Sequence, residues 1–168
     1  MRTPLDARIT LVLGGTRSGK SSVAEQLAAR GGGTVTYVAT ASVADEDMAR
    51  RVALHRARRP RSWGTFELTS SAELPAVLAR LDGSVVVDSL GTWVASAPDL
   101  EVDAAALVAA LQERSGSTVV VSEEVGLALH PATELGRRFV DALGHLNQIV
   151  AAVAERVLLV VAGRTLEL

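Results

Sequence analysis

Short apolar strands alternate with helical segments along this 168-residue chain, and no other feature of the sequence restricts its fold as strongly. Near-continuous runs of valine, isoleucine and leucine are typical of strands buried on both faces of a parallel sheet. The runs are Ile9–Leu13, Val35–Ala39, Ser84–Val87, Thr118–Ser122 and Val157–Val161. The segments with helical spacing are Lys20–Arg30, Asp45–Arg59, Ser71–Leu81, Asp103–Arg114 and Thr133–Arg156. This alternation predicts a layered α/β fold with a mostly parallel sheet, to which Leu166–Leu168 adds a short returning edge strand.

Length and composition narrow the class of protein further. A chain of this size fits one domain, expected over 1–168, and it contains no cysteine for disulfides or thiolate metal sites. Its longest apolar stretch, near Val157–Ala162, is far below the roughly 20 residues needed to span a bilayer, and its first residues lack the layout of a secretory signal. A net charge of −2 supplies no basic field for nucleic acid. We therefore expect a cytoplasmic protein with no membrane span and no nucleic-acid partner.

A glycine-rich segment between the first expected strand and helix has the spacing G-x-x-x-x-G-K-[ST], which is typical of phosphate binding. We call this segment the phosphate loop, and it consists of Gly14, Gly15, Thr16, Arg17, Ser18, Gly19, Lys20 and Ser21. Its backbone N–H groups would surround an anion, with Lys20 at the β- and γ-phosphates and Ser21 at Mg²⁺. Lys20 is the only lysine among 17 lysine and arginine residues, which favours this function over a plain glycine-rich turn. Arg17 is either a second cation at the phosphates or a solvated loop residue.

Carboxylates follow two other expected strands, and the carboxyl ends of parallel strands meet at one edge of the sheet. Asp88 follows the run Val85–Val87 and is either a ligand for Mg²⁺ or a residue that caps the next turn. Glu123 and Glu124 end another strand. One of them is a candidate for orienting a hydroxyl nucleophile or the water shell of the metal, although ordinary loop acids would give the same pattern.

The expected helix Asp45–Arg59 carries an unusual excess of positive charge around a histidine. Acids at its start and cations at its end suit the helix dipole, but six arginines between Arg50 and Arg61 exceed that need. Arg51 and His55 share one face of this helix at helical spacing, together with either Arg58 or Arg59. Neighbouring cations keep an imidazole neutral and nucleophilic and attract a polyphosphate. His55 is therefore a candidate for an N-phosphoryl intermediate, although spacing alone favours a surface histidine on a solvated face.

Several separated blocks resemble the bifunctional adenosylcobinamide kinase/adenosylcobinamide-phosphate guanylyltransferases of cobalamin nucleotide-loop assembly, which are P-loop enzymes. The resemblance covers nearly the whole chain. It rests on GGTRSGKSSVAE from Gly14, TYVATA from Thr36, DEDMARRVALHRARRP from Asp45, W-x-T-x-E from Trp63, VVVDSLGTWV from Val85, and EVGLALHP followed by LGRRFVDALGHLNQ. Many unrelated kinases share the phosphate loop, whereas the arginine-rich helix followed by R-P-x-x-W is much more specific to this family.

The resemblance implies a RecA-like P-loop fold of three layers and a homotrimeric enzyme with two reactions. A hydroxyl of adenosylcobinamide would take the γ-phosphoryl group of ATP or GTP, and the adenosylcobinamide phosphate would then receive GMP from GTP. His55 stands at the position of the nucleophile that would carry GMP between the two substrates. The other residues that the resemblance assigns to catalysis, to the nucleotide or to Mg²⁺ are Lys20, Ser21, Arg51, Arg58, Glu67 and Asp88.

Three positions depart from the pattern of the family. Glu123 stands where an asparagine is common, His130 where an aliphatic residue is usual, and Ser96 where an asparagine often follows the tryptophan-containing block. The extra charge of Glu123, near the expected nucleotide edge, leaves base and metal functions open for Glu123 and Glu124.

The sequence does not identify the corrinoid site. Trp63 and Trp93 are candidates for its apolar walls, but core packing explains either side chain as well. Two other functions stay open from the residues: a small-molecule kinase without guanylyl transfer, and a switch protein that binds nucleotide and changes a partner contact.

Overall fold

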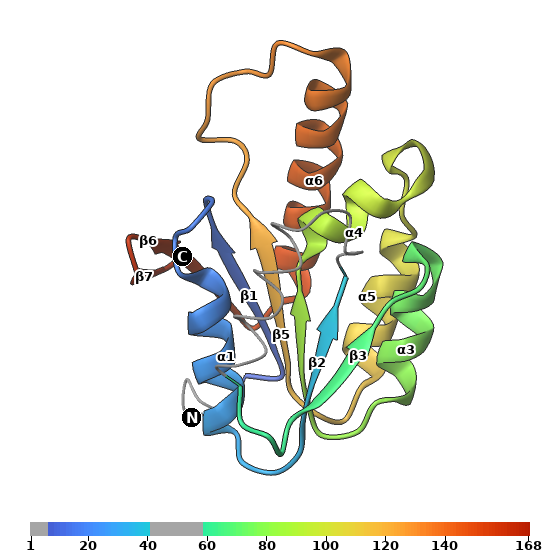
Figure 1. The fold of residues 1–168 in the computed structure, drawn as a ribbon, viewed down its shortest axis with the longest axis vertical. Helices are drawn as coiled ribbons and strands as arrows, with labels where there is room; N and C mark the ends of the chain where they lie inside the picture. Colours follow the sequence, from blue (N-terminus) through green and yellow to red (C-terminus); the bar gives the residue numbers. More distant parts are fainter. Residues whose placement is uncertain (1–6, 41–58) are drawn as a thin grey trace.

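A computed structural model describes residues 7–40 and 59–168, which form one central sheet with helices on its two faces (Figure 1). The predicted helix Asp45–Arg59, and with it Arg51, His55 and Arg58, lies outside the described residues except for Arg59 itself. The strands are β1 (Ile9–Gly14), β2 (Val35–Ala39), β3 (Gly64–Glu67), β4 (Ser84–Asp88), β5 (Thr118–Glu123), β6 (Arg156–Val161) and β7 (Arg164–Glu167). The helices are α1 (Lys20–Arg30), η1 (Ser71–Glu73), α3 (Leu74–Arg80), α4 (Leu90–Ser96), η2 (Pro98–Leu100), α5 (Ala104–Glu113) and α6 (Glu134–Val153).

The strand order β3-β2-β4-β5-β1-β6-β7 confirms the predicted fold class. All neighbouring strands are parallel except β7, which pairs antiparallel with β6 at the edge. β5 lies between β1 and β4, so Gly14 pairs with Glu123 and Asp88 pairs with Val121. The carboxyl ends of these three strands, with the phosphate loop and two of the predicted acids, therefore meet at one edge of the sheet.

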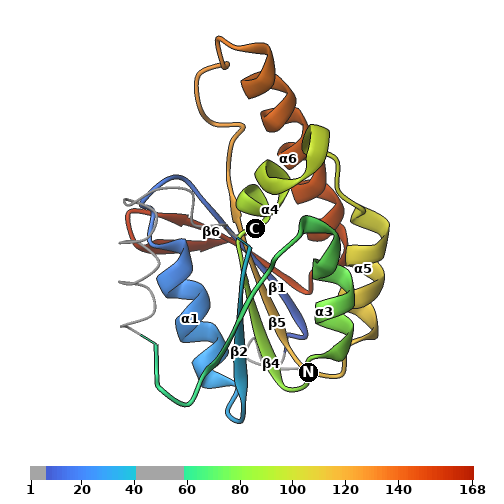
Figure 2. The ribbon, with the colours of Figure 1, turned by 45° about the vertical axis from the view of Figure 1, so that its right-hand side comes forward.

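The sheet separates two apolar cores, which gives the three layers seen in Figure 2. α1 covers one face, while α3, α4, α5 and α6 cover the other. Successive side chains of a strand point to opposite faces, and the valines of β4 follow this rule: Val85 and Val87 enter the larger core, and Val86 enters the core beneath α1. Burial on both faces explains why the strands read as continuous apolar runs in the sequence.

Two elements, β3 and α4, were not predicted from the sequence. β3 is a four-residue edge strand whose side chains are all exposed, so it lacks an apolar pattern. α4 starts directly after β4, where Ser89 caps it by accepting a hydrogen bond from the Thr92 N–H. The Thr92 side chain in turn accepts from the Ser89 N–H, a reciprocal cap that a hydroxyl residue three positions after a serine could have suggested.

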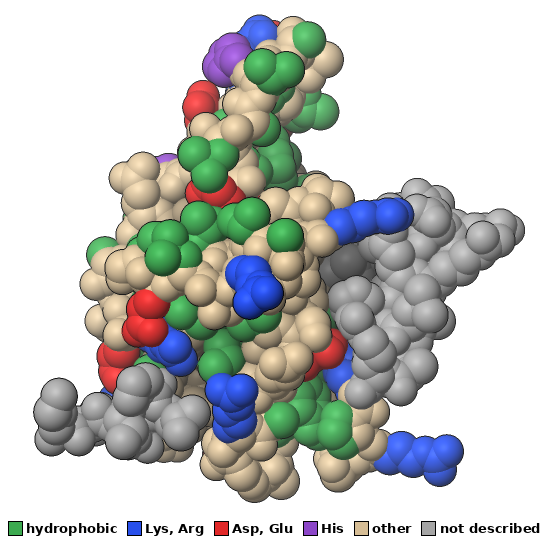
Figure 3. Space-filling model, turned by 90° about the vertical axis from the view of Figure 1, so that its left-hand side faces the viewer, with side chains coloured by type: hydrophobic (Ala, Val, Ile, Leu, Met, Phe, Trp, Pro, Cys, Tyr) green, Lys and Arg blue, Asp and Glu red, His purple; other side chains and the backbone are tan. Residues whose placement is uncertain are grey.

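The loop 124–133 and the first turns of α6 project beyond the sheet edge as an arm, drawn in orange in Figure 1. The arm exposes large apolar side chains, with 81% of Leu127, 95% of Leu129 and 63% of Leu135 accessible. Figure 3 shows apolar side chains on this arm and, lower on the same face, around the C-terminal hairpin. Among the described residues, no helix is both long and apolar enough to cross a membrane.

Candidate active site

The phosphate loop connects β1 to α1 and is shaped by its glycines. Gly19 caps α1 with a φ of 95°, a left-handed conformation that glycine adopts without strain. A Cβ on Gly14 would meet the Ser18 Oγ and would lie 2.8 Å from the backbone oxygen of Val160. A Cβ on Gly15, by contrast, would meet nothing within 4 Å. The first glycine is thus required for packing in the protein itself, whereas the second leaves open space at the loop surface.

The loop is held by backbone contacts to the strands on either side of it. The Gly163 N–H, in the turn between β6 and β7, donates to the Ser18 oxygen at 2.8 Å, and the Glu124 N–H donates to the Gly14 oxygen at 3.1 Å. The C-terminal hairpin therefore supports the phosphate loop directly. These hydrogen bonds hold the loop in place before any ligand binds, as preorganised binding of a phosphate chain requires.

Lys20 lies between the loop backbone and a carboxylate. Its Nζ donates to the Gly15 oxygen at 3.3 Å and lies 3.5 Å from Glu123 Oε1. Glu123 Oε1 and Oε2 each lie 3.0 Å from the Ser89 Oγ, which donates to them. Of Glu123 and Glu124, it is Glu123 whose carboxylate lies within ion-pair distance of Lys20.

Buried polar contacts fix the position of Glu123. Asn147 on α6 donates its Nδ2 to the Glu123 backbone oxygen at 3.0 Å and accepts from the Ser122 Oγ at 2.6 Å. A Cβ on Gly91 would collide with the Glu123 carboxylate, whose Cδ would lie 2.8 Å away, so the carboxylate occupies the space that this glycine leaves. Asn147 and Gly91 are site-forming residues that the sequence analysis did not identify, since neither carries a charge.

Asp88 ends β4 on the other side of Glu123 and is held by the chain's single tyrosine. The Tyr37 hydroxyl donates to Asp88 Oδ2 at 2.6 Å. Burial, followed by the negative charge of Asp88, raises the pKa of Tyr37 far above its ordinary value, so the phenol stays protonated as a donor. The Arg59 guanidinium lies over the Tyr37 ring, 3.7 Å from its centre. Asp88 is thus oriented by a hydrogen bond that leaves its second oxygen available to a ligand.

The other two predicted glutamates are Glu124 and Glu67. Glu124 turns into the loop after β5, where its Oε1 accepts from the Gly126 N–H at 2.5 Å. It also lines a hollow of about 370 Å³ with Gly15, Thr16, Arg17 and Ser18 on one side and Leu127 on the other. Glu67 ends β3, four strands away from β1, which is roughly 19 Å at the usual strand spacing. Glu67 therefore lies apart from the contacts that form the phosphate loop, and its assignment to the nucleotide stays a prediction.

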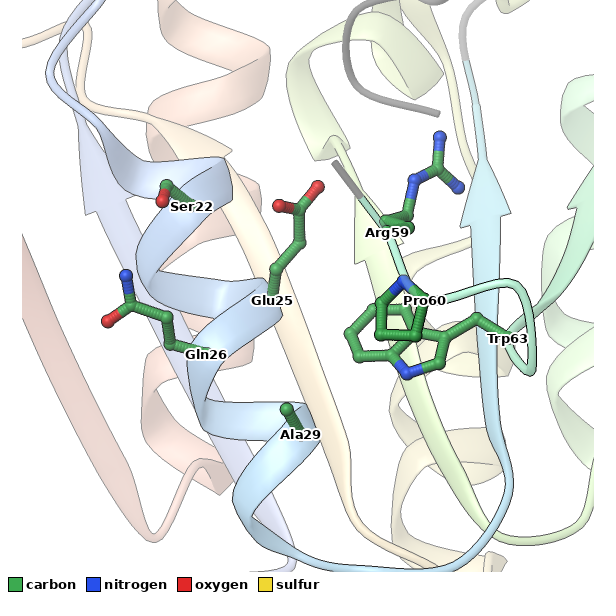
Figure 4. Close-up of a pocket in the computed structure, with 7 residues that line it drawn as sticks. All are labelled: Ser22, Glu25, Gln26, Ala29, Arg59, Pro60 and Trp63. Carbon is green, nitrogen blue, oxygen red and sulfur yellow. The ribbon is translucent and has the colours of Figure 1, made fainter. Parts of the chain in front are cut away.

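The two tryptophans have different environments. Trp93 is 1% exposed in the larger core, and its Nε1 donates to the Ser71 oxygen at 2.7 Å, so core packing accounts for it. Trp63 is partly exposed and lines a second hollow of about 280 Å³ beside α1. Figure 4 shows this hollow between α1 and the segment 59–63. The lining residues are Ser22, Glu25, Gln26, Ala29, Arg59, Pro60 and Trp63.

The oxygen donors at the loop suit Mg²⁺ bound to a nucleotide. Mg²⁺ keeps several waters and uses one or two protein ligands together with substrate phosphates. Ser21 at the start of α1 and Asp88 at the end of β4 supply a hydroxyl and a carboxylate of this kind. Within residues 7–40 and 59–168, no three His, Cys, Asp or Glu side chains cluster closely enough to bind a metal on their own. This donor set fits a metal that arrives with the nucleotide.

Comparison with known proteins decides between the functions that this geometry allows. A family model described as cobinamide kinase / cobinamide phosphate guanyltransferase matches residues 10–168. The chain belongs to this family. It is 44% identical over 161 residues to the bifunctional adenosylcobalamin biosynthesis protein CobP of Pseudomonas aeruginosa, with 91% of this chain and 92% of that protein covered. It is 34% identical over 173 residues to the corresponding CobU protein of Escherichia coli, with 91% and 95% covered. The chain is accordingly a cobinamide kinase and cobinamide phosphate guanyltransferase.

Solved structures with low sequence identity share the fold alone. The flagellar accessory protein FlaH of Methanocaldococcus jannaschii superposes with a TM-score of 0.55 at 13% identity, over 94% of this chain and 74% of that one. An ATPase from a bacterial type III secretion system superposes with a TM-score of 0.59 at 9% identity, over 90% of this chain and 50% of that one. These similarities agree with the predicted RecA-like P-loop fold.

Proposed function

We propose that the two family activities use one nucleotide site at the phosphate loop, with adenosylcobinamide and its phosphate as acceptors. The observation that carries this proposal is the meeting of Lys20, Glu123 and Asp88 at the carboxyl ends of three neighbouring strands. A phosphate chain bound by the loop amides would have the Lys20 ammonium beside it, Asp88 available to hold Mg²⁺, and Glu123 available to orient the attacking hydroxyl or the water shell of the metal. This arrangement suits phosphoryl transfer, in which positioning and charge neutralisation contribute most of the catalysis.

In the kinase reaction, the acceptor hydroxyl forms a bond to the γ-phosphorus of ATP or GTP while the bond to the β-phosphate oxygen breaks. Lys20 and the loop amides of Gly15–Gly19 hold the phosphates, and Arg17 adds a second cation at the mouth of the loop. Ser21 and Asp88 would hold Mg²⁺, which neutralises charge on the β- and γ-phosphates when it is bound. The acceptor hydroxyl loses its proton to the surrounding acidic edge or to water.

In the guanylyl reaction, we assign the nucleophile to His55. An imidazole nitrogen forms a bond to the α-phosphorus of GTP, and pyrophosphate leaves. An oxygen of adenosylcobinamide phosphate then attacks the same phosphorus and releases the histidine, giving adenosylcobinamide-GDP. The double displacement predicts ping-pong kinetics for the guanylyl reaction. Arg51 and Arg58 would be neighbouring cations for the nucleotide, and Glu67 would be a further nucleotide contact.

The remaining features of the proposal are the assembly and the location of the enzyme. We propose a homotrimer that works in the cytoplasm as a single catalytic domain over 1–168. The exposed apolar side chains of the projecting arm, which include Leu127 and Leu129, support self-association because isolated domains seldom expose such side chains together. Light scattering coupled to size-exclusion chromatography measures the assembly directly.

The histidine step is tested with GTP labelled at the α-phosphate. We expect an acid-labile, base-stable label that maps to His55 and disappears in His55→Ala. Pyrophosphate release before addition of the corrinoid phosphate accompanies the label. A protein that phosphorylates the corrinoid but releases no pyrophosphate and takes up no label would be a kinase alone, which contradicts the proposal. Corrinoid-independent GTP hydrolysis stimulated by a macromolecule would instead indicate a switch protein.

A further inference from the structure

The Glu123 carboxylate is fixed by neutral groups of α4 on one side and meets the phosphate loop on another. The Ser89 Oγ lies 3.0 Å from both of its oxygens. Because this Oγ itself accepts from the Thr92 N–H at 3.4 Å, its hydroxyl proton is available to the carboxylate. Gly91 leaves the space that the carboxylate occupies. The charged partner of Glu123 is Lys20, whose Nζ lies 3.5 Å from Oε1.

The groups that hold Glu123 are themselves buried. Ser89 is 2% exposed, and its N–H donates to the Thr40 Oγ1 at 2.8 Å. On the other side of the strand end, Asn147 donates to the Glu123 backbone oxygen at 3.0 Å. The carboxylate is therefore oriented before any ligand binds, which is the condition for a group that acts at one defined position.

Glu123 differs in its contacts from the other two acids at this edge of the sheet. Asp88 gives one oxygen to the Tyr37 hydroxyl, and its second oxygen is the one assigned to Mg²⁺. Glu124 accepts from the Gly126 N–H in the loop that follows β5. Glu123 is thus the acid that lies beside the lysine of the phosphate loop and has no assigned metal.

The position of this carboxylate suits contact with an attacking hydroxyl. The lysine of a phosphate loop reaches the β- and γ-phosphates, so a carboxylate 3.5 Å from the Lys20 Nζ lies beside the phosphoryl group that is transferred. An ionised carboxylate has about four acceptor sites, and the contacts with Ser89 and Lys20 leave some of them for a substrate. A hydroxyl that approaches the γ-phosphorus can therefore donate to Glu123.

We propose that Glu123 is the general base of the kinase reaction. As the acceptor oxygen bonds to the γ-phosphorus and the bond to the β-phosphate oxygen breaks, the hydroxyl proton moves to a carboxylate oxygen of Glu123. The carboxylic acid gives this proton to water when the products leave. Ser89 is then a positioning residue that holds the carboxylate. The inference rests on the proposed function, because it takes the phosphate loop as the site of the γ-phosphoryl group.

Glu123 is a departure from the pattern of the family, in which an asparagine is common at this position. The amide of an asparagine can accept a hydrogen bond from a hydroxyl, but it does not take up the proton. A base at this position is therefore a property of this chain.

The base is required in one of the two reactions. The acceptor of the kinase reaction is a hydroxyl, which must lose its proton to become a phosphate ester. In the guanylyl reaction as proposed, the attacking nitrogen of a neutral imidazole has a lone pair and no proton to lose. Removal of the Glu123 carboxylate should therefore slow phosphoryl transfer more than labelling of His55.

The test compares wild type with Glu123→Gln in single-turnover transfer of the γ-phosphoryl group from ATP to adenosylcobinamide, with Mg²⁺ present. Glutamine has nearly the shape of glutamate and still accepts a hydrogen bond, but it does not take up a proton. We expect the rate to fall at least about 100-fold, the lower end of what a base contributes. The ratio of phosphoryl transfer to His55 labelling by GTP should fall by a similar factor. The affinity for GDP should not fall, because the variant removes a negative charge beside the phosphates.

A second variant moves the carboxylate without removing it. A Cβ on Gly91, in α4, would lie 2.8 Å from the Glu123 Cδ, and the flexible end of that side chain can shift. We expect Gly91→Ala to fold and to transfer phosphate at least about 10-fold more slowly, since a misplacement of about 1 Å can cost 100-fold. Gly144→Ala, in α6, is the matched control. Its methyl group would meet nothing within 4 Å, so it should transfer phosphate at the wild-type rate.

Transfer by folded Glu123→Gln within about 10-fold of the wild-type rate would overturn the proposal, because orientation of the hydroxyl would then suffice. A loss of rate matched by an equal loss of GDP affinity would overturn it as well, since Glu123 would then act on the bound phosphates or the metal shell. If thermal unfolding shows that Glu123→Gln does not fold, the glycine pair decides, and equal rates for Gly91→Ala and Gly144→Ala would contradict the proposal. Failure of the proposed function is distinct: wild type itself would transfer no phosphate or take up no label at His55.

Discussion

The substitution of one loop glycine tests whether the phosphate loop is packed as described. In Gly14→Ala, the new methyl group would press on the Ser18 side chain and on the backbone oxygen of Val160, only 2.8 Å from its position. The Ser18 side chain can rotate, but the β6 backbone is fixed in the sheet by its pairing with β1. Overpacking of this kind costs about 1–3 kcal/mol. For a chain of this size that corresponds to a fall of roughly 2–12 °C in Tm.

The neighbouring substitution Gly15→Ala is the matched control. Its methyl group would point into open space, and Gly15 does not have a positive φ, so no strain is introduced. Replacing glycine by alanine without strain stabilises a protein by about 0.4–1 kcal/mol through the unfolded chain. Calorimetry of the two variants and wild type, without nucleotide, should therefore give a lower Tm for Gly14→Ala alone. Equal melting temperatures for the two variants would refute the described packing of β6 against the loop.

Two other predictions concern the residues that hold the carboxylates. Asn147→Leu leaves the Ser122 hydroxyl and the Glu123 carbonyl without their partner, at a cost of about 1–3 kcal/mol for each unsatisfied group; urea unfolding measures it, and a change below about 0.5 kcal/mol would contradict it. Tyr37 has a raised pKa in the folded chain, so its stabilisation is complete below pH 10 and is lost above it as the unfolded phenol ionises. Wild type should lose up to about 1.4 kcal/mol per pH unit there that Tyr37→Phe does not lose, and because this is the only tyrosine, tyrosinate absorbance should appear together with unfolding. Tyrosinate formation in the folded chain would contradict the prediction.

The sequence predicted the parts of the fold that are buried on both sides. Val85–Val87 and Val119–Val121 are buried, so their composition alone identifies them as strands. The exposed strand β3 has no such signal, and the short helix α4 was hidden because it follows Asp88 without a loop. Local sequence patterns therefore identified the strands whose burial requires apolar residues. They did not identify an exposed edge strand or a short helix that is defined by its cap.

The sequence named candidate residues for the site but did not show which of them contact one another. The motif spacing pointed to Lys20, and a strand end pointed to Asp88. The sequence left Glu123 and Glu124 equivalent, because which of these two consecutive side chains turns toward Lys20 depends on how β5 packs beside β1. The contact of Glu123 with Lys20 and Ser89 follows from that strand order, which pairs residues far apart in the chain. Tyr37 was missed for the same reason, since its partner Asp88 is 51 residues away.

Both reactions are proposed to use the same nucleotide site at the phosphate loop. The substitution Lys20→Ala tests this most directly. In the same preparation, one assay follows transfer of the γ-phosphoryl group to the corrinoid and another follows labelling of His55 by α-labelled GTP. We predict that both rates fall together, by at least about 100-fold, because the same ammonium group stabilises phosphate charge in each step. Lys20→Arg keeps the charge and controls for folding. A Lys20→Ala protein that loses one reaction and retains the other at the wild-type rate would show that the two reactions use different sites.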